Sequence, residues 1–87
     1  MPNFVTLERD INDLLELATA QLTPIERAEV QGFLKVGEYG LALETFTDII
    51  IEEEKQINIA ILNKCNEIAR QMEMTPEACE KMRSLVI

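Results

Sequence analysis

The chain contains no histidine and no tryptophan, and Ser84 is its only serine. These absences remove the commonest general base and nearly every hydroxyl nucleophile of the catalytic triads. The sequence also lacks a glycine-rich phosphate loop, an HExxH helix and an EF-hand loop. We therefore predict that the protein is not an enzyme, and that it has no catalytic residues, no metal site and no bound cofactor.

Cysteine is scarce, since Cys65 and Cys79 are the only two among 87 residues. Two cysteines are too few for the disulfide framework of a small secreted domain, so we expect two free thiols in the core. No apolar run reaches the roughly 18 residues of a membrane span, and the N-terminus lacks the pattern of a secretory signal. These features predict a cytoplasmic protein with no membrane partner.

Basic residues are also few, with 8 lysines and arginines against 16 acidic residues and a formal charge of −8. Binding to nucleic acid requires basic side chains that neutralise phosphates, so we expect no nucleic-acid partner. An anionic membrane surface is disfavoured for the same reason. The charge instead favours a basic protein as partner, because opposite fields speed association.

The hydrophobic residues make up 47% of the chain and recur at steps of three and four residues. This spacing is typical of amphipathic helices, and no stretch alternates for long enough to predict a strand. We predict helices at residues 4–22, 24–36, 38–54, 57–73 and from residue 76 onward. The expected fold is an all-α bundle of four to five short helices in a single domain, residues 1–87.

Several local patterns predict where these helices begin. In "LTPIERAEV", Thr23 can cap, Pro24 occupies the first helical position and Glu26 completes a capping box. Thr75 and Pro76 repeat the threonine-proline start for the last helix. The first helix could begin a turn later than residue 4, with Thr6 as its N-cap.

The three glycines predict one helix end and two positions where another helix could approach closely. Gly37 suits the left-handed conformation just past a helix end. Gly32 lies inside the second helix, where glycine costs about 1 kcal/mol relative to alanine. That cost is explained if another helix crosses closely there, and the glycines of the turn from Gly37 to Gly40 would likewise permit close helix approach.

The third predicted helix concentrates the negative charge. Residues 38–54 contain no lysine or arginine but six acids, namely Glu38, Glu44, Asp48, Glu52, Glu53 and Glu54. At about 100° per residue, Glu44, Asp48 and Glu52 share one side of the helix, flanked by Leu41 and Ile51. The opposite side, facing the core, carries Tyr39, Ala42, Leu43, Phe46, Ile49 and Ile50.

Like charges four residues apart destabilise a helix by about 0.2–0.5 kcal/mol per pair. This arrangement of like charges lowers helix stability with no visible local benefit, and such positions are candidates for a functional surface. The acidic side could instead be an ordinary solvated face, and Leu41 and Ile51 could be covered by another helix of the bundle. Tyr39 could be a core residue with its hydroxyl at the edge, or a contact to a partner.

The segment "GEYGLALE" at residues 37–44, followed by an aliphatic and glutamate-rich helix end, resembles the MafI-type immunity proteins of bacterial polymorphic toxin and contact-dependent growth inhibition systems. Those proteins are small, acidic and helical. The threonine-proline helix starts and the segment "RQMEMTPEA" also fit. The resemblance covers roughly residues 20–78.

The resemblance implies a protein that binds and neutralises the C-terminal domain of a cognate toxin, a basic RNase or DNase. Carboxylates of the third helix would then pair with lysines and arginines of the toxin's cleft. Our own assignment places Glu44, Asp48 and Glu52 as the pairing groups, with Glu38, Glu53 and Glu54 at the rim and Tyr39 and Leu41 beside them. We expect a monomer or weak dimer when the protein is free.

Two other functions compete with this one. A helical adaptor would use the same acidic face to meet some other basic protein. A small regulator could bind nucleic acid through a helix-turn-helix made of the second and third helices, but the third helix has no basic residue to contact phosphates.

Overall fold

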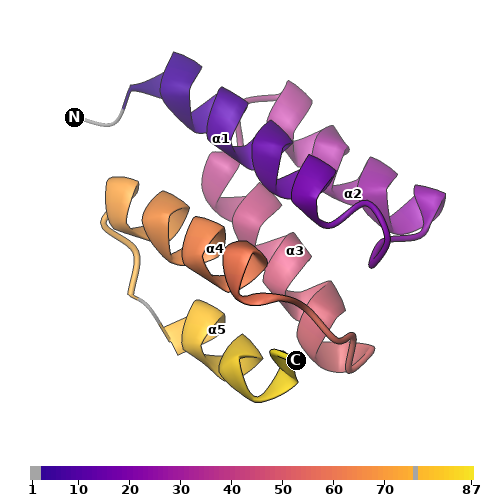
Figure 1. Ribbon diagram of the computed structural model, residues 1–87. Coiled ribbons are helices and arrows are strands. Elements are labelled where there is room, and N and C mark those ends of the chain that lie inside the picture. Colours follow the sequence, from indigo (N-terminus) through magenta and orange to yellow (C-terminus); the bar gives the residue numbers. More distant parts are fainter. Residues whose placement is uncertain (1–2, 76) are drawn as a thin grey trace.

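The computed structural model describes residues 3–75 and 77–87 and shows a small all-α bundle (Figure 1). Its elements are α1 (Phe4–Leu17), α2 (Pro24–Lys35), α3 (Tyr39–Glu52), α4 (Ile59–Gln71), α5 (Glu77–Glu80) and the 3-10 helix η1 (Lys81–Leu85). The predicted fold class is therefore confirmed. Within these described residues, no helix combines the length and apolar character that crossing a membrane requires.

Side-chain caps set three of the helix starts. Asn3 accepts a hydrogen bond from the Thr6 backbone N–H at 3.1 Å, so α1 begins at Phe4 and the alternative with Thr6 as cap is wrong. Thr23 and Glu26 form the predicted capping box of α2. Asn58 caps α4 through the Ile61 N–H at 3.0 Å, which moves its start two residues past the predicted one. The predicted start of α5 at Pro76 lies outside the described residues.

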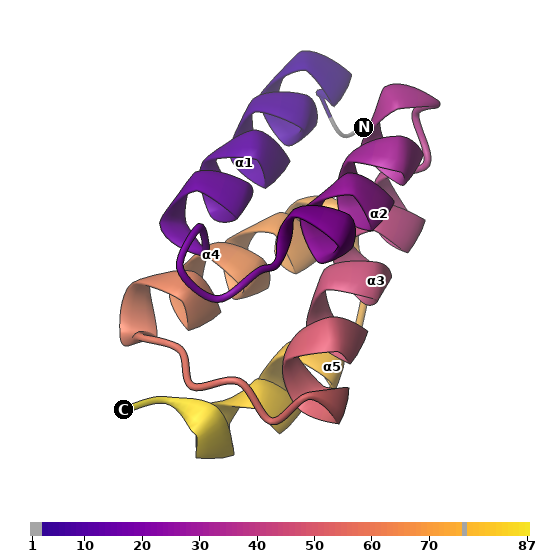
Figure 2. The same ribbon diagram turned by 90° about the vertical axis from the view of Figure 1, so that its right-hand side faces the viewer.

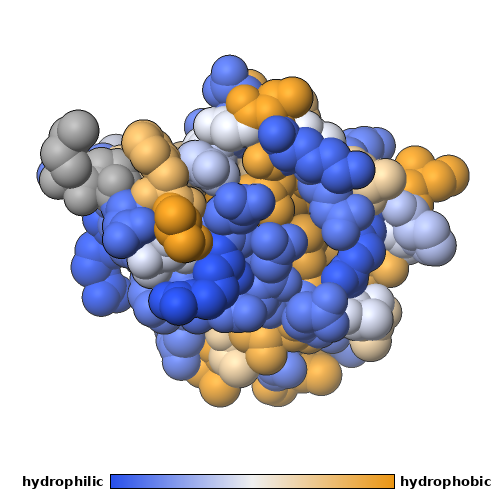
Figure 3. Space-filling view, turned by 90° about the horizontal axis from the view of Figure 1, so that it is seen from above, coloured by the Kyte–Doolittle hydropathy of each residue, from blue (hydrophilic) through white to orange (hydrophobic). Residues whose placement is uncertain are grey.

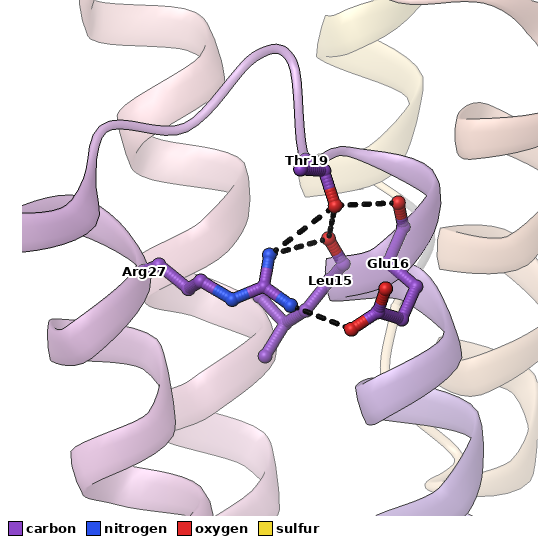
Figure 4. A network of polar contacts seen from close by, with 4 residues as sticks. All are labelled: Leu15, Glu16, Thr19 and Arg27. Carbon is purple, nitrogen blue, oxygen red and sulfur yellow. Dashed lines mark hydrogen bonds and ion pairs between the residues drawn. The ribbon is translucent and has the colours of Figure 1, made fainter.

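The first helix ends at Leu17, several residues earlier than the predicted residue 22. Figure 4 shows the polar network at this end. Arg27 of α2 donates to the Leu15 carbonyl at 3.0 Å, and the Thr19 hydroxyl donates to the Glu16 carbonyl at 2.8 Å. Arg27 also forms an ion pair with the Glu16 carboxylate at 2.8 Å. These side chains satisfy carbonyls of the last turn, which lack an α-helical backbone partner at a helix end.

Helix α3 occupies the centre of the bundle and packs against all of the other elements, α1, α2, α4, α5 and η1. In Figure 2 α1 lies at the upper left, α2 and α3 lie on the right, α4 crosses the middle and α5 lies at the bottom; Figure 1 likewise shows α5 beneath α4. The core includes the fully buried large side chains Phe46, Leu7, Ile11, Leu14, Leu15, Leu43, Ile50, Ile57, Ile61, Leu62, Ile68 and Met82.

The C-terminus closes the bundle by a pairing that the sequence did not predict. Val86 forms an isolated parallel bridge with Ile57, the fully buried residue between α3 and α4. The Ile57 N–H donates to the Leu85 carbonyl and the Ile87 N–H donates to the Ile57 carbonyl, both at 2.9 Å. The end of the chain is therefore held against the segment that follows α3.

A buried carboxylate ties α1 to α4. Asp10 is only 5% exposed and accepts a hydrogen bond from the Gln71 amide at 2.7 Å, while Lys64 lies 3.5 Å from its other oxygen. The hydrogen bond from Gln71 lowers the pKa of the Asp10 carboxyl, with Lys64 adding to the effect and burial opposing it. The three side chains satisfy one another's hydrogen bonds and charges. Removing one of them would lower the stability of the fold, because it would leave a buried polar or charged group without its partner.

We predict that Asp10→Ala lowers the free energy of unfolding by about 1–3 kcal/mol at neutral pH, because Gln71 and Lys64 lose their acceptor. Since the folded-state pKa of Asp10 lies below its ordinary value of 3.8, its contribution is present above that pH and is lost as the pH falls through the folded value. Urea denaturation at neutral and acid pH measures both effects. The exposed Asp13→Ala serves as control, and equal losses in the two variants would contradict the assignment.

The expectation of a close helix crossing at Gly32 is wrong. A Cβ atom built at Gly32 meets no heavy atom within 4 Å, and the same holds at Gly40. Only Gly37 has a conformation that requires glycine, with φ of +77° just past the end of α2. The backbone conformation therefore requires glycine at one of the three positions, and packing requires it at neither of the other two.

We predict that Gly32→Ala raises the free energy of unfolding by about 1 kcal/mol, because alanine gains helix propensity there without a clash. Gly37→Ala should lower the free energy of unfolding, because a side chain is strained in the left-handed region. Thermal unfolding of the two variants beside the parent measures both. A destabilised Gly32→Ala would show that the exposed face of α2 is closer to a neighbour than described.

Candidate functional site

The acids of α3 lie on its outer face. Glu44, Asp48 and Glu52 are all exposed and follow one another along one side of the helix, spaced by about 6 Å along its axis. Leu41, which is 43% exposed, continues the row toward the N-terminal end. Exposed Glu53 and Glu54 follow where α3 ends. We call these six residues the acidic ridge.

The inner face of α3 is buried in the core, which leaves only the outer face for the charged side chains. Ala42, Leu43, Phe46, Thr47 and Ile50 are buried, and Tyr39, Ile49 and Ile51 pack against the core with part of their surface exposed. Thr47 was not predicted to be inside. Its hydroxyl donates to the Glu44 carbonyl at 2.9 Å, so a polar side chain fits the core without an unsatisfied group.

The structure separates some of the predicted contact residues from the others. Ile51 packs against the core, whereas Leu41 is exposed beside the acids. Tyr39 lies about 160° around the helix from Leu41 and stacks on Phe4 of α1, with ring centroids 5.7 Å apart. Glu38 is exposed immediately before α3, at an N-cap position without a side-chain hydrogen bond. The ridge therefore excludes Tyr39 and Ile51, and Glu38 stands at its margin.

None of the six acids at positions 38–54 forms an ion pair among the described residues. The ion pairs there involve Glu16, Glu26, Asp10, Glu67 and Glu80 instead. Lys55 is the basic residue nearest to the ridge in the sequence, and its ammonium group lies 2.9 Å from Glu26 at the start of α2. The nearby cation is thus bound elsewhere, and the charge of the ridge stays uncompensated.

Glu26 holds Lys55 with a carboxylate that serves a second purpose. It accepts a hydrogen bond from the Thr23 backbone N–H at 2.9 Å, as the capping box requires. That backbone hydrogen bond, followed by the contact with Lys55, lowers the pKa of the Glu26 carboxyl. Because the capping box orients this carboxylate, the ammonium group of Lys55 is directed toward the start of α2.

Three helices end in the same backbone geometry. The residue just past the end has a positive φ in Gly37, Glu54 and Glu73. The following N–H bonds back to a carbonyl five residues earlier, as from Lys55 to Ile50 at 3.0 Å. Glycine is favoured at such a position because a side chain is strained there. The chain nevertheless has glutamate at two of these three ends, and one of them, Glu54, belongs to the ridge.

Three surface hollows lie away from the ridge. One of about 640 Å³ lies between α1 and α4 and is lined by Asp13, Glu16, Leu17, Ala60, Asn63, Lys64 and Glu67. Smaller ones of about 280 and 320 Å³ lie at the α4–α5 and α1–α2 contacts. The ridge itself is the outer surface of a helix, which is convex. It is therefore shaped to enter a cleft rather than to enclose a ligand.

Exposed apolar side chains are scattered over the molecule. Phe4, Val5, Ile25, Val36, Ile59 and Ile87 are each more than half exposed, and they belong to different ends of the fold. The view from above shows a largely hydrophilic surface with hydrophobic side chains mainly at its margins and in a seam at its middle (Figure 3). In residues 3–75 and 77–87, no group of three or more histidine, cysteine, aspartate or glutamate side chains is arranged to hold a metal ion.

Comparisons with protein-family models, with curated proteins and with solved structures find no match to this chain. The family resemblance of residues 37–44 therefore stays a hypothesis from the sequence. Function is argued below from the geometry and charge of the ridge.

We predict that Glu54→Gly and Glu73→Gly each raise the free energy of unfolding by about 1 kcal/mol, because glycine relieves the left-handed strain. At low ionic strength Glu54→Gly should gain more than Glu73→Gly, since it also removes repulsion within the ridge. Salt near 1 M should abolish that difference. Urea denaturation at the two salt concentrations measures it, and a difference independent of salt would show that the ridge carries no strong mutual repulsion.

Proposed function

We propose that the protein is an immunity protein, which binds a cognate bacterial toxin domain and neutralises it through the acidic ridge. One observation carries the proposal. Glu44, Asp48 and Glu52 are exposed along one side of α3, and Glu53 and Glu54 are exposed just past its end. None of these acids takes an ion pair among the described residues, while the neighbouring Lys55 is bound to Glu26. A surface left in this state attracts a strongly basic partner.

A nuclease domain is the partner whose chemistry fits best. Enzymes that cut RNA or DNA bind phosphates with lysine and arginine, and their clefts are concave and basic. A helix that presents carboxylates at intervals of about 6 Å can pair with those cations and exclude the nucleic acid. Charge-assisted hydrogen bonds from lysine and arginine to carboxylate are about twice as strong as neutral ones.

Leu41 adds an apolar contact at the start of the same row. It is 43% exposed, and interfaces combine an apolar contact with a polar surround. Because α3 packs against every other element of the fold, the backbone that carries Glu44, Asp48 and Glu52 is fixed before binding. Such preorganisation reduces the entropy lost on association.

The ridge predicts the result of a charge reversal. Glu44→Lys combined with Asp48→Lys should weaken binding to the toxin domain by about 100-fold or more, because two attractive pairs become repulsive. The far-ultraviolet circular dichroism should be unchanged, since both side chains are exposed. The partner is obtained by affinity capture at about 0.15 M salt, and its affinity for each variant is measured by calorimetry.

Glu8→Lys combined with Asp13→Lys is the matched control. It changes the net charge by the same amount on exposed positions of a different helix, α1. Equal loss of affinity in the two double variants would show that net charge alone explains the effect. An unchanged affinity of the Glu44→Lys, Asp48→Lys variant would show that the interface does not include the ridge.

A second assay separates an immunity protein from an adaptor that uses the same ridge. An immunity protein abolishes the nuclease activity of the captured domain at equal stoichiometry. It also restores growth of cells that express that domain. An adaptor binds its partner without inhibiting it, so a captured partner with unaltered activity would favour the adaptor function.

A further inference from the structure

One ion pair joins the end of α3 to the start of α2. The ammonium group of Lys55, just past the end of α3, lies 2.9 Å from the carboxylate of Glu26 in the first turn of α2. Both side chains are largely shielded from water, with exposures of 19% and 18%. Such shielding strengthens the attraction between two opposite charges and reduces its screening by salt.

The carboxylate of Glu26 is held in place by contacts within α2. The oxygen that meets Lys55 also accepts a hydrogen bond from the Thr23 backbone N–H at 2.9 Å, and the positive end of a helix favours a carboxylate. The hydrogen bond from Thr23, followed by the contact with Lys55, lowers the pKa of the Glu26 carboxyl, so this group is charged at neutral pH. An oriented anion therefore stands at the start of α2.

Lys55 would have other anions within reach if Glu26 did not hold it. The exposed acids Glu52, Glu53 and Glu54 come directly before it in the chain, and none of them forms an ion pair within residues 3–75 and 77–87. The last turn of a helix also attracts cations, and lysine has a long flexible side chain. A released Lys55 is therefore expected to turn toward the end of α3 and to neutralise part of the ridge.

We propose that Glu26 is a positioning residue for the acidic ridge: it holds Lys55 away from Glu52, Glu53 and Glu54, and thereby raises the affinity of the ridge for a basic partner. The inference rests on the proposed function of the ridge, because it concerns the strength of binding at that same surface. Glu26 does not itself touch the partner. Its effect passes through the position of Lys55.

Glutamine at position 26 separates this role from the capping of α2. A capping box accepts glutamine as well as glutamate, because the side-chain oxygen of either residue can accept the hydrogen bond from the backbone of Thr23. Glu26→Gln therefore removes the charge that holds Lys55 and leaves the start of α2 capped. Circular dichroism should show the same helical content in the variant and in the parent protein.

The test uses a fluorescently labelled hexaarginine peptide as a basic probe, titrated with the whole protein at low ionic strength. Glu26→Gln should bind the peptide about fivefold more weakly than the parent, because the released Lys55 competes with it for the carboxylates at residues 52–54. Glu8→Gln is the matched control, since it removes one exposed carboxylate from α1, and its affinity should stay close to that of the parent. Salt near 1 M should abolish the difference between the two variants.

A second substitution tests whether the effect passes through Lys55. Glu26→Gln combined with Lys55→Gln should bind the peptide as tightly as the parent, because no cation remains to turn toward the ridge. A purely structural effect of Glu26→Gln would not be rescued in this way. Equal affinities of Glu26→Gln and Glu8→Gln, or a failure of Lys55→Gln to restore binding, would overturn the proposal.

The charge reversal Glu44→Lys with Asp48→Lys separates failure of this inference from failure of the proposed function. If the reversal weakens peptide binding and Glu26→Gln does not, the ridge attracts cations and only the role of Glu26 is wrong. If Glu26→Gln and its rescue behave as expected but no toxin domain binds the protein, the role of Glu26 holds and the immunity function is wrong. A peptide affinity that the reversal leaves unchanged would overturn both.

Discussion

The burial of one face of α3 is the constraint on which the rest of the structure depends. Every other element packs against this helix, and Phe46 at its middle is completely buried. The five surrounding elements leave only part of the helix circumference in water, so its charged side chains occupy that part. The core thus dictates where the ridge lies. It does not dictate the sign of the charge, because one or two lysines among these positions would be equally well solvated and would reduce the repulsion.

The basic residues pair with carboxylates between helices and not with those of the ridge. Arg27 joins α2 to α1, Lys64 joins α4 to α1, and Lys55 joins the end of α3 to the start of α2. These cations bridge helices around the sides of the bundle, where they also satisfy carbonyls and caps. Exposed ion pairs contribute little to stability, so leaving the ridge unpaired costs the fold little. The same choice concentrates a negative field on one surface, where it can steer a partner.

The sequence predicted what local periodicity controls and missed what tertiary contacts control. The helices, the Thr23 capping box and the acidic side of α3 follow from spacing along one segment. At the early end of α1, a carbonyl accepts a hydrogen bond from Arg27, which comes from another helix. Thr47 is buried because the other elements surround α3, and its hydroxyl is satisfied within its own helix. The helical spacing placed Tyr39 on the core side of α3 but left open whether its ring is part of the core or contacts a partner. In the structure the ring stacks on Phe4. Because Phe4 belongs to α1, the pattern within α3 alone could not identify this stacking partner.

The shape of the ridge limits the kind of ligand it can recognise. A convex helix surface cannot surround a small molecule, whose sites are concave and bury most of the ligand. Recognition by a convex acidic surface therefore requires a macromolecule that supplies the concavity and the cations. Glu54 supports this argument, since it retains a carboxylate in a left-handed position where glycine would be less strained. Its counterpart Glu73 has the same backbone but stands away from the ridge, so strain alone does not indicate function. What distinguishes Glu54 is its place in a row of unpaired carboxylates, and only a basic surface brought from outside can compensate that row.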